Sequence, residues 1–466
     1  MKRIAIVGGG IAGLAAAYEL ARNGDPIQTT LFESSPRLGG IIETIREGGF
    51  LIEGGPDGWM TEKPWASELA RELGLDDELL PCNEADRRTY VLREGHLKPV
   101  PDGMRMMVPS DFDALHGSSL FSAQAIQAYL DEPSRAAELR KSAPAHDESV
   151  ASFVRRHFGD EVLNTIGAPL LSGVFGGDVA QLSVRAVMAP FVTMEREHGS
   201  LIAALRSRAA SDGQRQPIFT TLRSGLGTLI DRIVASLPQQ WIRLDSEVLT
   251  MDLNNDGWTI TTSMGAERFD AVMLAAPTHI AKSLISPIDS RAAELMQMDA
   301  SSAVVVGFGF ANSANFALPP GFGFLVPRNS ASLLLACTFM DQKFDGRVPA
   351  GGRLLRAFFG GESALRLMHC RNDEIAAIAR LELARILGPL PEPQVTIIRR
   401  WPSSLPQYGV GHLERMAELD QRIRALGSLS LLGNGYHGVG IPDLIRDSRV
   451  AARSLVASLY SSSLNI

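Results

Sequence analysis

The sequence predicts an α/β protein of two lobes, one of them Rossmann-like and the other built on an antiparallel sheet, with a helical insertion. Three observations predict this fold class. A strand, a glycine-rich turn, a helix and a second strand follow one another in residues 3–32. Helical periodicity dominates residues 110–205, and short apolar strands dominate residues 302–401. A chain of 466 residues is also longer than one core normally grows, so we expect two or three domains.

The first unit is the most regular part of the pattern. Residues 3–7 form an apolar run that enters a glycine cluster, residues 14–23 have helical spacing, and residues 27–32 are again apolar. Gly24 is placed to end the helix. We therefore expect strand, helix and strand of a parallel sheet.

Later segments predict a change from helices to strands. A helix is expected from 147 to 157, and a small β-meander is expected from 243–249, 259–262 and 269–276, with a turn at 255–257. The second sheet is expected from 302–310, 322–326, 332–340, 353–359 and 395–401, with a helix at 373–387. A last strand at 428–432, a glycine loop at 433–440 and a helix at 442–458 complete the pattern.

Composition excludes several classes of protein. Hydrophobic residues make up 45% and charged residues 21%, which is ordinary for a globular protein. The 45 Lys and Arg against 52 Asp and Glu give a net charge of −7, and no basic block appears, so no nucleic acid partner is expected. Cys82, Cys337 and Cys370 have no metal-ligand spacing and are odd in number. We expect a cytoplasmic protein without disulfides and without a metal site.

Membrane segments are not predicted either. The first apolar run leads directly into Gly8-Gly9-Gly10 without a cleavage site, so it is interpreted as a strand and not as a signal peptide. The longest apolar stretches fall short of the roughly 18 residues that a span needs.

The first glycine cluster has the complete context of a dinucleotide-binding turn. Gly8-x-Gly10-x-x-Gly13 lies between a strand and a helix, and Glu33 ends the next strand. Gly8 permits the tight turn, Gly10 lets a pyrophosphate approach the backbone, and Gly13 allows close packing of the helix. Glu33 is placed to accept hydrogen bonds from a ribose.

The nucleotide could be NAD or FAD, and two further loops favour FAD. Arg37 precedes the glycine pair Gly39-Gly40, and a second glycine segment covers 53–58. Both segments could also be plain surface turns. The loop at 433–440 joins a strand to a helix whose N-terminus can stabilise negative charge on a flavin. Because no cysteine lies in that loop, we expect FAD to be bound non-covalently.

These segments resemble the flavin amine oxidase superfamily. Further strings resemble its oxygen-dependent protoporphyrinogen and coproporphyrinogen oxidases, in order along nearly the whole chain: 55–57, 169–178, 182–186, 197–202, 321–323, 406–412 and 433–436. The resemblance implies a haem-synthesis enzyme that oxidises a porphyrinogen to a porphyrin at FAD, with dioxygen as the final electron acceptor. It assigns no catalytic side chain beyond the flavin.

The resemblance also implies a set of site residues. The cofactor-binding residues are Gly8, Gly9, Gly10, Ile11, Ala12, Gly13, Glu33, Ser34, Arg37, Gly39, Gly40, Gly55, Pro56, Asp57, Gly58, Val248, Trp401, Val439, Gly440 and Ile441. Two positions depart from the family's pattern. Ile41 stands where many relatives carry Trp, and His437 replaces a common acid.

For the substrate, the family's propionate-binding arginine matches Arg88, and its ring-clamping residues match Phe322, Gly323 and Leu325. Arginine binds a carboxylate with two hydrogen bonds, and apolar side chains cover a macrocycle. Without the family, a solvated arginine pair and an ordinary core strand would explain the same residues. Arg87 is the neighbouring rival for the arginine role.

The resemblance leaves several alternatives open. Protoporphyrinogen is weakly favoured over coproporphyrinogen, and an amine- or polyene-oxidising enzyme or a non-catalytic porphyrin carrier are the rival functions. Segment 104–130 is a candidate for peripheral membrane contact, and a homodimer is left open. We expect the FAD-binding domain in 1–80, 210–290 and 425–466, the substrate domain in 81–105 and 291–424, and the helical insertion in 106–209.

Overall fold

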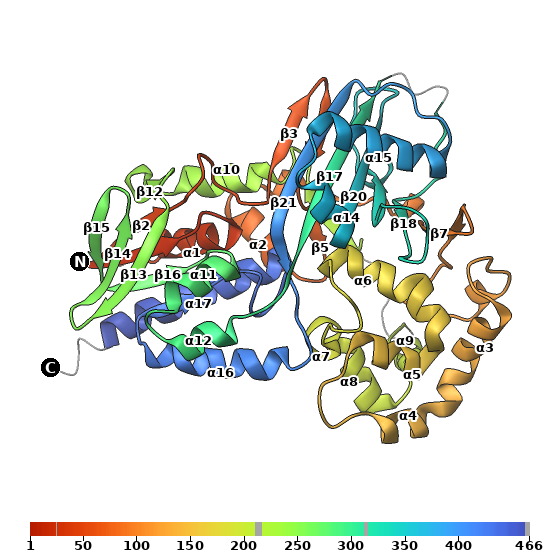
Figure 1. Ribbon diagram of the computed structural model, residues 1–466, viewed down its shortest axis with the longest axis horizontal. Helices are drawn as coiled ribbons and strands as arrows, with labels where there is room; N and C mark the ends of the chain where they lie inside the picture. The colour runs from red at the N-terminus through yellow and green to blue at the C-terminus, as the bar shows by residue number, and fades with distance from the viewer. Residues whose placement is uncertain (25, 210–216, 312–315, 462–466) are drawn as a thin grey trace.

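Two separate sheets organise the chain in the computed structural model, which describes residues 1–466 except 25, 210–216, 312–315 and 462–466. One sheet lies in the left half of Figure 1, and the other rises in its upper right. A group of helices lies below the second sheet. The predicted α/β class, with two lobes and a helical insertion, is confirmed.

The first sheet is entirely parallel, with the order β12-β2-β1-β16-β22. Its strands are β1 (Lys2–Val7), β2 (Ile27–Phe32), β12 (Ile242–Arg243), β16 (Ala271–Leu274) and β22 (Leu429–Leu431). The parallel arrangement brings the carboxyl ends of these strands to one edge, where a doubly wound sheet binds its ligand.

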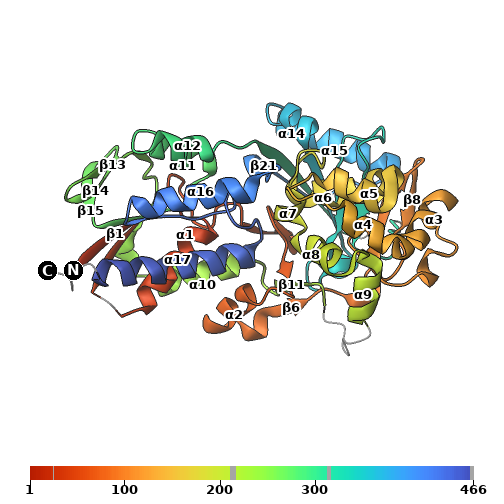
Figure 2. The same ribbon diagram turned by 90° about the horizontal axis from the view of Figure 1, so that it is seen from below.

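Helices cover one face of this sheet, and their apolar sides form a common core with it. They are α1 (Ile11–Arg22), α2 (Trp65–Glu72), α10 (Gly227–Ser236) and α17 (Ile441–Ser461). The first and last helices of the chain, α1 and α17, pack against each other, and Figure 2 shows α17, in dark blue, running toward the C-terminus at the left.

The opposite face carries a small antiparallel sheet and three helices. These elements are β13 (Val248–Asn254), β14 (Gly257–Thr262), β15 (Gly265–Phe269), α11 (Thr278–Ile285), α12 (Ser290–Leu295) and α16 (His412–Ala425). The prediction that segment 269–276 completes a β-meander was wrong. After Phe269 the chain turns at Asp270 and enters the parallel sheet as β16.

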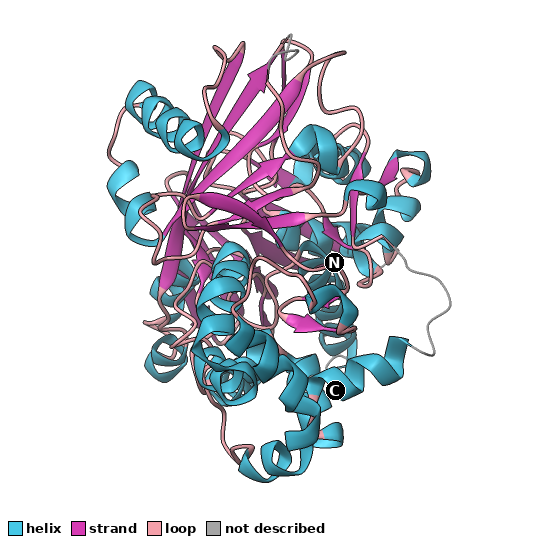
Figure 3. Cartoon of the chain, turned by 90° about the vertical axis from the view of Figure 1, so that its right-hand side faces the viewer, coloured by secondary structure: helices cyan, strands magenta, loops and turns pink. Residues whose placement is uncertain are grey.

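The second sheet has the order β21-β17-β20-β19-β18-β7-β8 and is antiparallel except between β18 and β7. Its strands are β7 (Thr89–Arg93), β8 (His96–Pro99), β17 (Ala300–Phe310), β18 (Gly323–Leu325), β19 (Ala336–Phe339), β20 (Arg353–Gly360) and β21 (Val395–Pro406). Helices α14 (Gly361–Leu367) and α15 (Asn372–Leu387) share an apolar core with one of its faces. Figure 3 shows its strands running together at the top of the molecule.

The helical insertion has a core of its own. It comprises α3 (Ala123–Asp131), α4 (Ala136–Ser142), α5 (Val150–Val162), α6 (Ala168–Phe175), α7 (Val184–Val187), α8 (Ala189–His198) and α9 (Leu201–Ala209). In the candidate membrane segment, Met107, Leu115 and Leu120 are fully buried in this core. Membrane contact through these side chains would therefore require them to leave the core. No helix in the described part of the chain is long and apolar enough to cross a membrane.

Short elements connect these parts. The strands are β3 (Thr44–Glu47), β4 (Phe50–Glu53), β5 (Trp59–Met60), β6 (Leu79–Pro81), β9 (Met104–Arg105), β10 (Val108–Pro109) and β11 (Phe219–Leu222). The helical turns are α13 (Met340–Lys343), η1 (Asp76–Glu78), η2 (Glu84–Asp86), η3 (Asp113–Leu115), η4 (Glu132–Arg135), η5 (Leu163–Gly167) and η6 (Gln239–Trp241).

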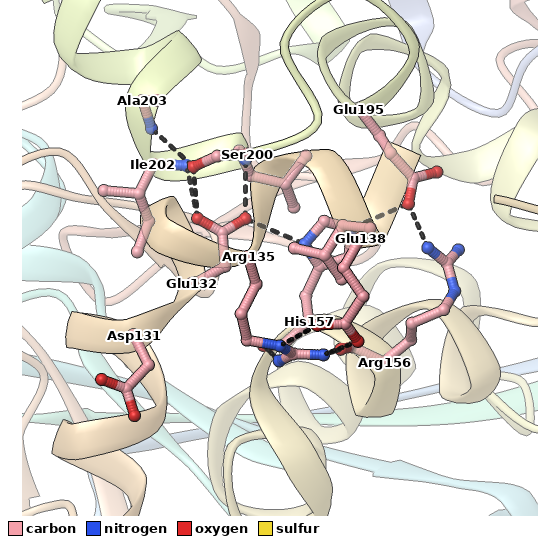
Figure 4. A network of polar contacts seen from close by, with 12 residues as sticks. Asp131, Glu132, Arg135, Glu138, Arg156, His157, Glu195, Ser200, Ile202 and Ala203 are labelled. Carbon is pink, nitrogen blue, oxygen red and sulfur yellow. Dashed lines mark hydrogen bonds and ion pairs between the residues drawn. The ribbon is translucent and has the colours of Figure 1, made fainter. Parts of the chain in front are cut away.

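A buried polar network joins the helices of the insertion (Figure 4). The ring of His157 on α5 lies between two carboxylates, with Nδ1 2.9 Å from Glu132 and Nε2 3.1 Å from Glu195. Glu132 also accepts the backbone N–H of Leu201 at the start of α9, and Glu195 pairs with Arg156. Four separate segments are thereby held through one imidazole.

Candidate flavin and substrate site

The cofactor edge begins where β1 and β2 end. The Gly8 N–H donates to the Phe32 carbonyl at 2.8 Å, so the turn after β1 is tied to the end of β2. The Glu33 carboxylate accepts from the N–H groups of Gly9 at 2.7 Å and Ser35 at 2.9 Å. Ser246, two residues before Val248, donates its N–H to the Glu33 carbonyl at 2.8 Å, and Val248 packs in the apolar cluster that includes Phe32. Ser34 is exposed beside it.

The N-terminus of α1 is open for a phosphate. Its first turn has no side-chain cap and no acidic residue, so its backbone N–H groups and the helix dipole are available to an anion. A Cβ placed on Gly10 would meet no described atom within 4 Å. A Cβ on Gly13 would lie 2.0 Å from the Gly8 carbonyl oxygen, so the helix packs here in a way that glycine alone permits. Ile11 and Ala12 lie on the buried first turn between them.

The second glycine loop lies directly on the first. The Gly39 N–H donates to the Gly9 carbonyl at 2.8 Å, and a Cβ on Gly40 would be 3.3 Å from the Gly10 Cα. The Arg37 guanidinium donates to the carbonyls of Leu38, Gly40 and Ile42. In this structure Arg37 braces its own loop, and its role toward a phosphate stays a prediction.

The third loop, residues 54–58, connects the two lobes. A Cβ on Gly55 would lie 2.0 Å from the Ile41 carbonyl oxygen, and the Trp401 indole donates to the Gly54 carbonyl at 2.8 Å. Pro56 and Gly58 flank Asp57, whose carboxylate is paired with Lys343 at 2.9 Å and Arg356 at 3.2 Å. Those cations hold the pKa of Asp57 below its usual value although burial opposes the ionised form.

Two residues without a role in the sequence prediction hold the C-terminal loop. The Tyr408 hydroxyl donates to the Asn434 carbonyl at 2.6 Å and accepts the Gly438 N–H at 3.0 Å. The His412 ring stacks on Tyr408 with centroids 3.9 Å apart, and its Nε2 lies 2.8 Å from the Tyr436 carbonyl. The string 406–412 carries the resemblance, but its sequence gave no physical reason for these contacts.

The held loop leads through Val439 and Gly440 to Ile441, the first residue of α17. Helix α17 thus supplies a second helix N-terminus, as the sequence predicts. The side chain of His437 is exposed and lies 3.4 Å from Asp420, so it is directed toward α16.

The four predicted substrate residues come together on two neighbouring strands. The Phe322 N–H donates to the Arg88 carbonyl at 2.7 Å, and the following pairs are Gly323 with Thr89 and Leu325 with Val91. Arg88 is exposed and Leu325 is partly exposed. Phe322 is 8% exposed and packs in an apolar cluster, so little of its ring is free to clamp a substrate.

The register of the second sheet connects these four substrate residues to the third loop. Gly323 pairs with Thr338, and Thr338 pairs with Arg356, which donates to the Gly55 carbonyl. At about 4.8 Å between neighbouring strands, Gly323 lies roughly 10 Å from the strand of Arg356. The candidate substrate residues and the candidate cofactor loops therefore border the same region between the lobes.

Comparison with protein families decides the class. The model of the flavin-containing amine oxidoreductase family matches residues 11–456. The chain belongs to this family. It is therefore an oxidoreductase that uses a flavin. In the described residues of this flavin oxidoreductase, no group of three or more His, Cys, Asp or Glu could hold a metal ion.

Individual relatives of this flavin oxidoreductase match over nearly its full length. The chain is 32% identical to a coproporphyrinogen III oxidase of Bacillus subtilis, covering 99% of both chains. It is 28% identical to a coproporphyrinogen III oxidase of Staphylococcus aureus, covering 98% of this chain and all of the relative. A solved structure from Exiguobacterium sp. 255-15, provisionally named protoporphyrinogen oxidase, has a TM-score of 0.87 at 31% identity over 98% of this chain and 99% of that one.

Proposed function

We propose that the protein is an FAD-dependent porphyrinogen oxidase of haem synthesis that uses dioxygen and acts on coproporphyrinogen III. The observation that carries this proposal is the convergence at one region of the uncapped N-terminus of α1, the start of α17, the three glycine loops and the substrate residues from Arg88 to Leu325. The full-length similarity to porphyrinogen oxidases supports it.

The residues at the sheet edge fit FAD. The open space over Gly10 and the uncapped start of α1 suit a pyrophosphate, and Glu33 with Val248 marks the ribose side. The flavin half would then contact the other segments of the site, which are Gly39-Gly40, Gly55 and Val439–Ile441. When bound, FAD supplies hydride acceptance from a meso carbon and passes the electrons to dioxygen, which leaves as hydrogen peroxide.

The protein's own contribution is to bind and orient the macrocycle and to exclude water. Arg88 offers an exposed guanidinium for a propionate, and Leu325 offers apolar surface beside α6, where a Cβ on Gly173 would lie 4.0 Å from Leu325 Cδ2. Coproporphyrinogen carries four propionates and protoporphyrinogen two. The names of the two bacterial relatives favour coproporphyrinogen III, in place of the weak preference for protoporphyrinogen that the sequence alone allowed.

The test is an aerobic assay with both porphyrinogens in parallel. Porphyrin fluorescence should rise with a higher kcat/KM for coproporphyrinogen III, and hydrogen peroxide should appear in proportion. A higher kcat/KM for protoporphyrinogen would reverse the substrate assignment. Oxidation of an amine or a polyene instead would support the rival enzyme class, and porphyrin binding without turnover would support a carrier.

Non-covalent attachment is tested separately. Cys82 and Cys337 are buried, and burial raises the pKa of both thiols, so neither is a reactive thiolate. Acid precipitation of the yellow holoprotein should release the flavin into the supernatant as FAD. Flavin that stays with the precipitate, or FMN in the supernatant, contradicts this proposal.

A further inference from the structure

Three cations from one short stretch are buried beneath the third glycine loop. Lys343 is 8% exposed, Arg356 is 1% exposed and Arg347 is fully buried. The Lys343 ammonium lies 2.9 and 3.1 Å from the two oxygens of Asp57, and Arg356 lies 3.2 Å from the same carboxylate. Arg356 also donates to the Gly55 carbonyl, so both cations are in direct contact with the loop.

The cations outnumber the carboxylates that face them. The carboxylates that act on the two arginines are Asp57 and Glu53, and Lys343 pairs with the same Asp57. Arg347 donates to the carbonyls of Leu222 and Arg223 and to the Thr221 hydroxyl, which are neutral acceptors. At least one positive charge is therefore unbalanced in a buried place. An unbalanced buried charge is costly, so an anionic group is expected nearby.

Glu53 compensates this charge weakly. It is fully buried and accepts from the Leu226 N–H at 2.9 Å and the Thr44 hydroxyl at 2.8 Å. Burial raises its pKa above the usual value. Whenever Glu53 takes up a proton, the positive excess becomes larger.

The position of the cation cluster points to the flavin as the anionic group. The contacted loop packs on Ile41, and Ile41 follows the Gly39-Gly40 pair that lies over Gly10. Since we assign Glu33 to the ribose side of Gly10, we place the flavin half on the other side, toward this loop and the second sheet, where Trp401 donates to Gly54. A flavin gains negative charge when it is reduced.

We propose that Lys343 and Arg356 act as positioning residues that raise the reduction potential of the bound flavin, by placing positive charge behind the Gly55–Asp57 loop. The inference rests on the proposed binding of FAD. Positive charge stabilises the reduced cofactor relative to the oxidised one and makes hydride acceptance easier. Asp57 partly offsets this effect and fixes the two cations in place.

The test is the two-electron midpoint potential of the FAD-loaded protein, measured by anaerobic reductive titration against a reference dye without substrate. Lys343→Met and Arg356→Met should each lower the preference for reduced over oxidised flavin about tenfold, which is about 30 mV. Asp57→Asn should shift the potential in the opposite direction. Arg353→Met is the matched control, because Arg353 lies on the same strand but pairs with Asp341 at 2.7 Å, and it should leave the potential unchanged.

The direction of the shifts in midpoint potential distinguishes an electrostatic effect of the cations from mechanical support of the loop. Loosening the loop would move the potential the same way in Lys343→Met and Asp57→Asn, and that result, or the absence of a shift in both, overturns the proposal. Arg356→Lys keeps the positive charge, so its midpoint potential should stay close to that of the wild type. If Arg356→Met does not fold, Lys343→Met and Asp57→Asn decide the test. A protein that takes up no FAD overturns this inference with the cofactor proposal. A holoprotein that oxidises no porphyrinogen overturns the substrate proposal alone.

Discussion

At the scale of single residues, Gly10 is the position at which we expect a substitution to affect cofactor binding and not folding. Its φ of −71° and ψ of 179° are allowed for any residue, and a Cβ there would meet no described atom within 4 Å. Gly10→Val should therefore keep the melting temperature of the apoprotein and abolish FAD binding, because the side chain fills the approach of the pyrophosphate. Thermal melting and FAD titration measure the two effects.

Gly13 is the contrasting position in the same turn. A Cβ there would lie 2.0 Å from the Gly8 carbonyl oxygen, so Gly13→Ala should destabilise the apoprotein itself. If Gly10→Val binds FAD with wild-type affinity, the pyrophosphate does not lie at the start of α1.

Arg88 carries the prediction for substrate capture. A charge-assisted hydrogen bond contributes about 1.5–3 kcal/mol, so Arg88→Ala should lower kcat/KM about ten- to a hundred-fold without changing FAD affinity. Arg88→Lys should recover part of the loss, since it keeps the charge but not the planar two-point geometry. Steady-state kinetics with coproporphyrinogen III measure both.

Arg87→Ala is the internal control, because Arg87 pairs with Glu84 at 3.2 Å. It should stay within a few-fold of wild type. If Arg87→Ala lowers kcat/KM and Arg88→Ala does not, the propionate contact belongs to Arg87. If neither variant lowers kcat/KM, the propionate is recognised elsewhere in the protein.

Residue contacts were predictable where they are close along the chain. The Gly8 to Glu33 geometry follows from one strand, one turn and one helix, so a local pattern describes it. The partners of Asp57 lie 286 and 299 residues away, and isolated Lys and Arg residues carry no signal of such a pairing. The cation cluster therefore needed the structure, whereas the glycine turn did not.

At the scale of elements, Tyr408 couples the end of the second sheet to the C-terminal loop. Its hydroxyl joins both sides of the loop through Asn434 and Gly438. Tyr408→Phe removes these two hydrogen bonds, each with a net contribution of about 1 kcal/mol, and should weaken FAD binding by about tenfold or more. Titration of the apoprotein with FAD measures the effect.

Tyr436→Phe is the matched control, because the Tyr436 hydroxyl is buried without a hydrogen-bond partner among the described residues. Its loss should leave FAD affinity unchanged. If neither variant loses FAD affinity, the aromatic rings, which both variants keep, hold the loop and the Tyr408 hydroxyl does not. Equal losses in both variants would contradict the assignment of the effect to the two hydrogen bonds of Tyr408.

The elements themselves were easier to predict than their partners. Helix 373–387 and the strands of the second sheet appear close to their expected positions, because period and length are local properties. Segment 269–276 was assigned to the wrong sheet. All four residues of β16 are buried, as expected for a strand covered on both faces of a parallel sheet, and that continuous apolar run was the available signal.

At the scale of the whole molecule, the chain crosses between the lobes several times, and side chains fasten the crossings. Arg399 of the second sheet pairs with Glu43, and Trp401 donates to Gly54, so both lobes contribute to the region between them. The helical insertion is fastened differently, through its buried network (Figure 4). Its stability should therefore depend on pH in its own way.

His157 determines the direction of that dependence. Burial opposes the charged ring, but the hydrogen bonds to Glu132 and Glu195 outweigh it and hold the pKa of His157 above its usual value. Arg156, which pairs with Glu195 and Glu148, and Arg135, which donates to the His157 carbonyl, are the neighbouring cations. A raised pKa in the folded state means that the stabilisation is complete below about pH 6.5 and is lost as pH rises through the folded pKa.

The variant His157→Gln tests this dependence, since it leaves the buried carboxylate of Glu132 without its cation, whereas Glu195 keeps Arg156, and it should cost about 3–5 kcal/mol at pH 6. The difference in melting temperature between wild type and variant should be largest near pH 6 and should narrow toward pH 9. His198→Gln is the control, because this histidine on α8 is 43% exposed at its side chain and should change stability by less than about 0.5 kcal/mol at any of these pH values. A difference for His157→Gln that stays constant from pH 6 to 9 would show that the ring holds the insertion as a neutral group, and that its charge adds nothing.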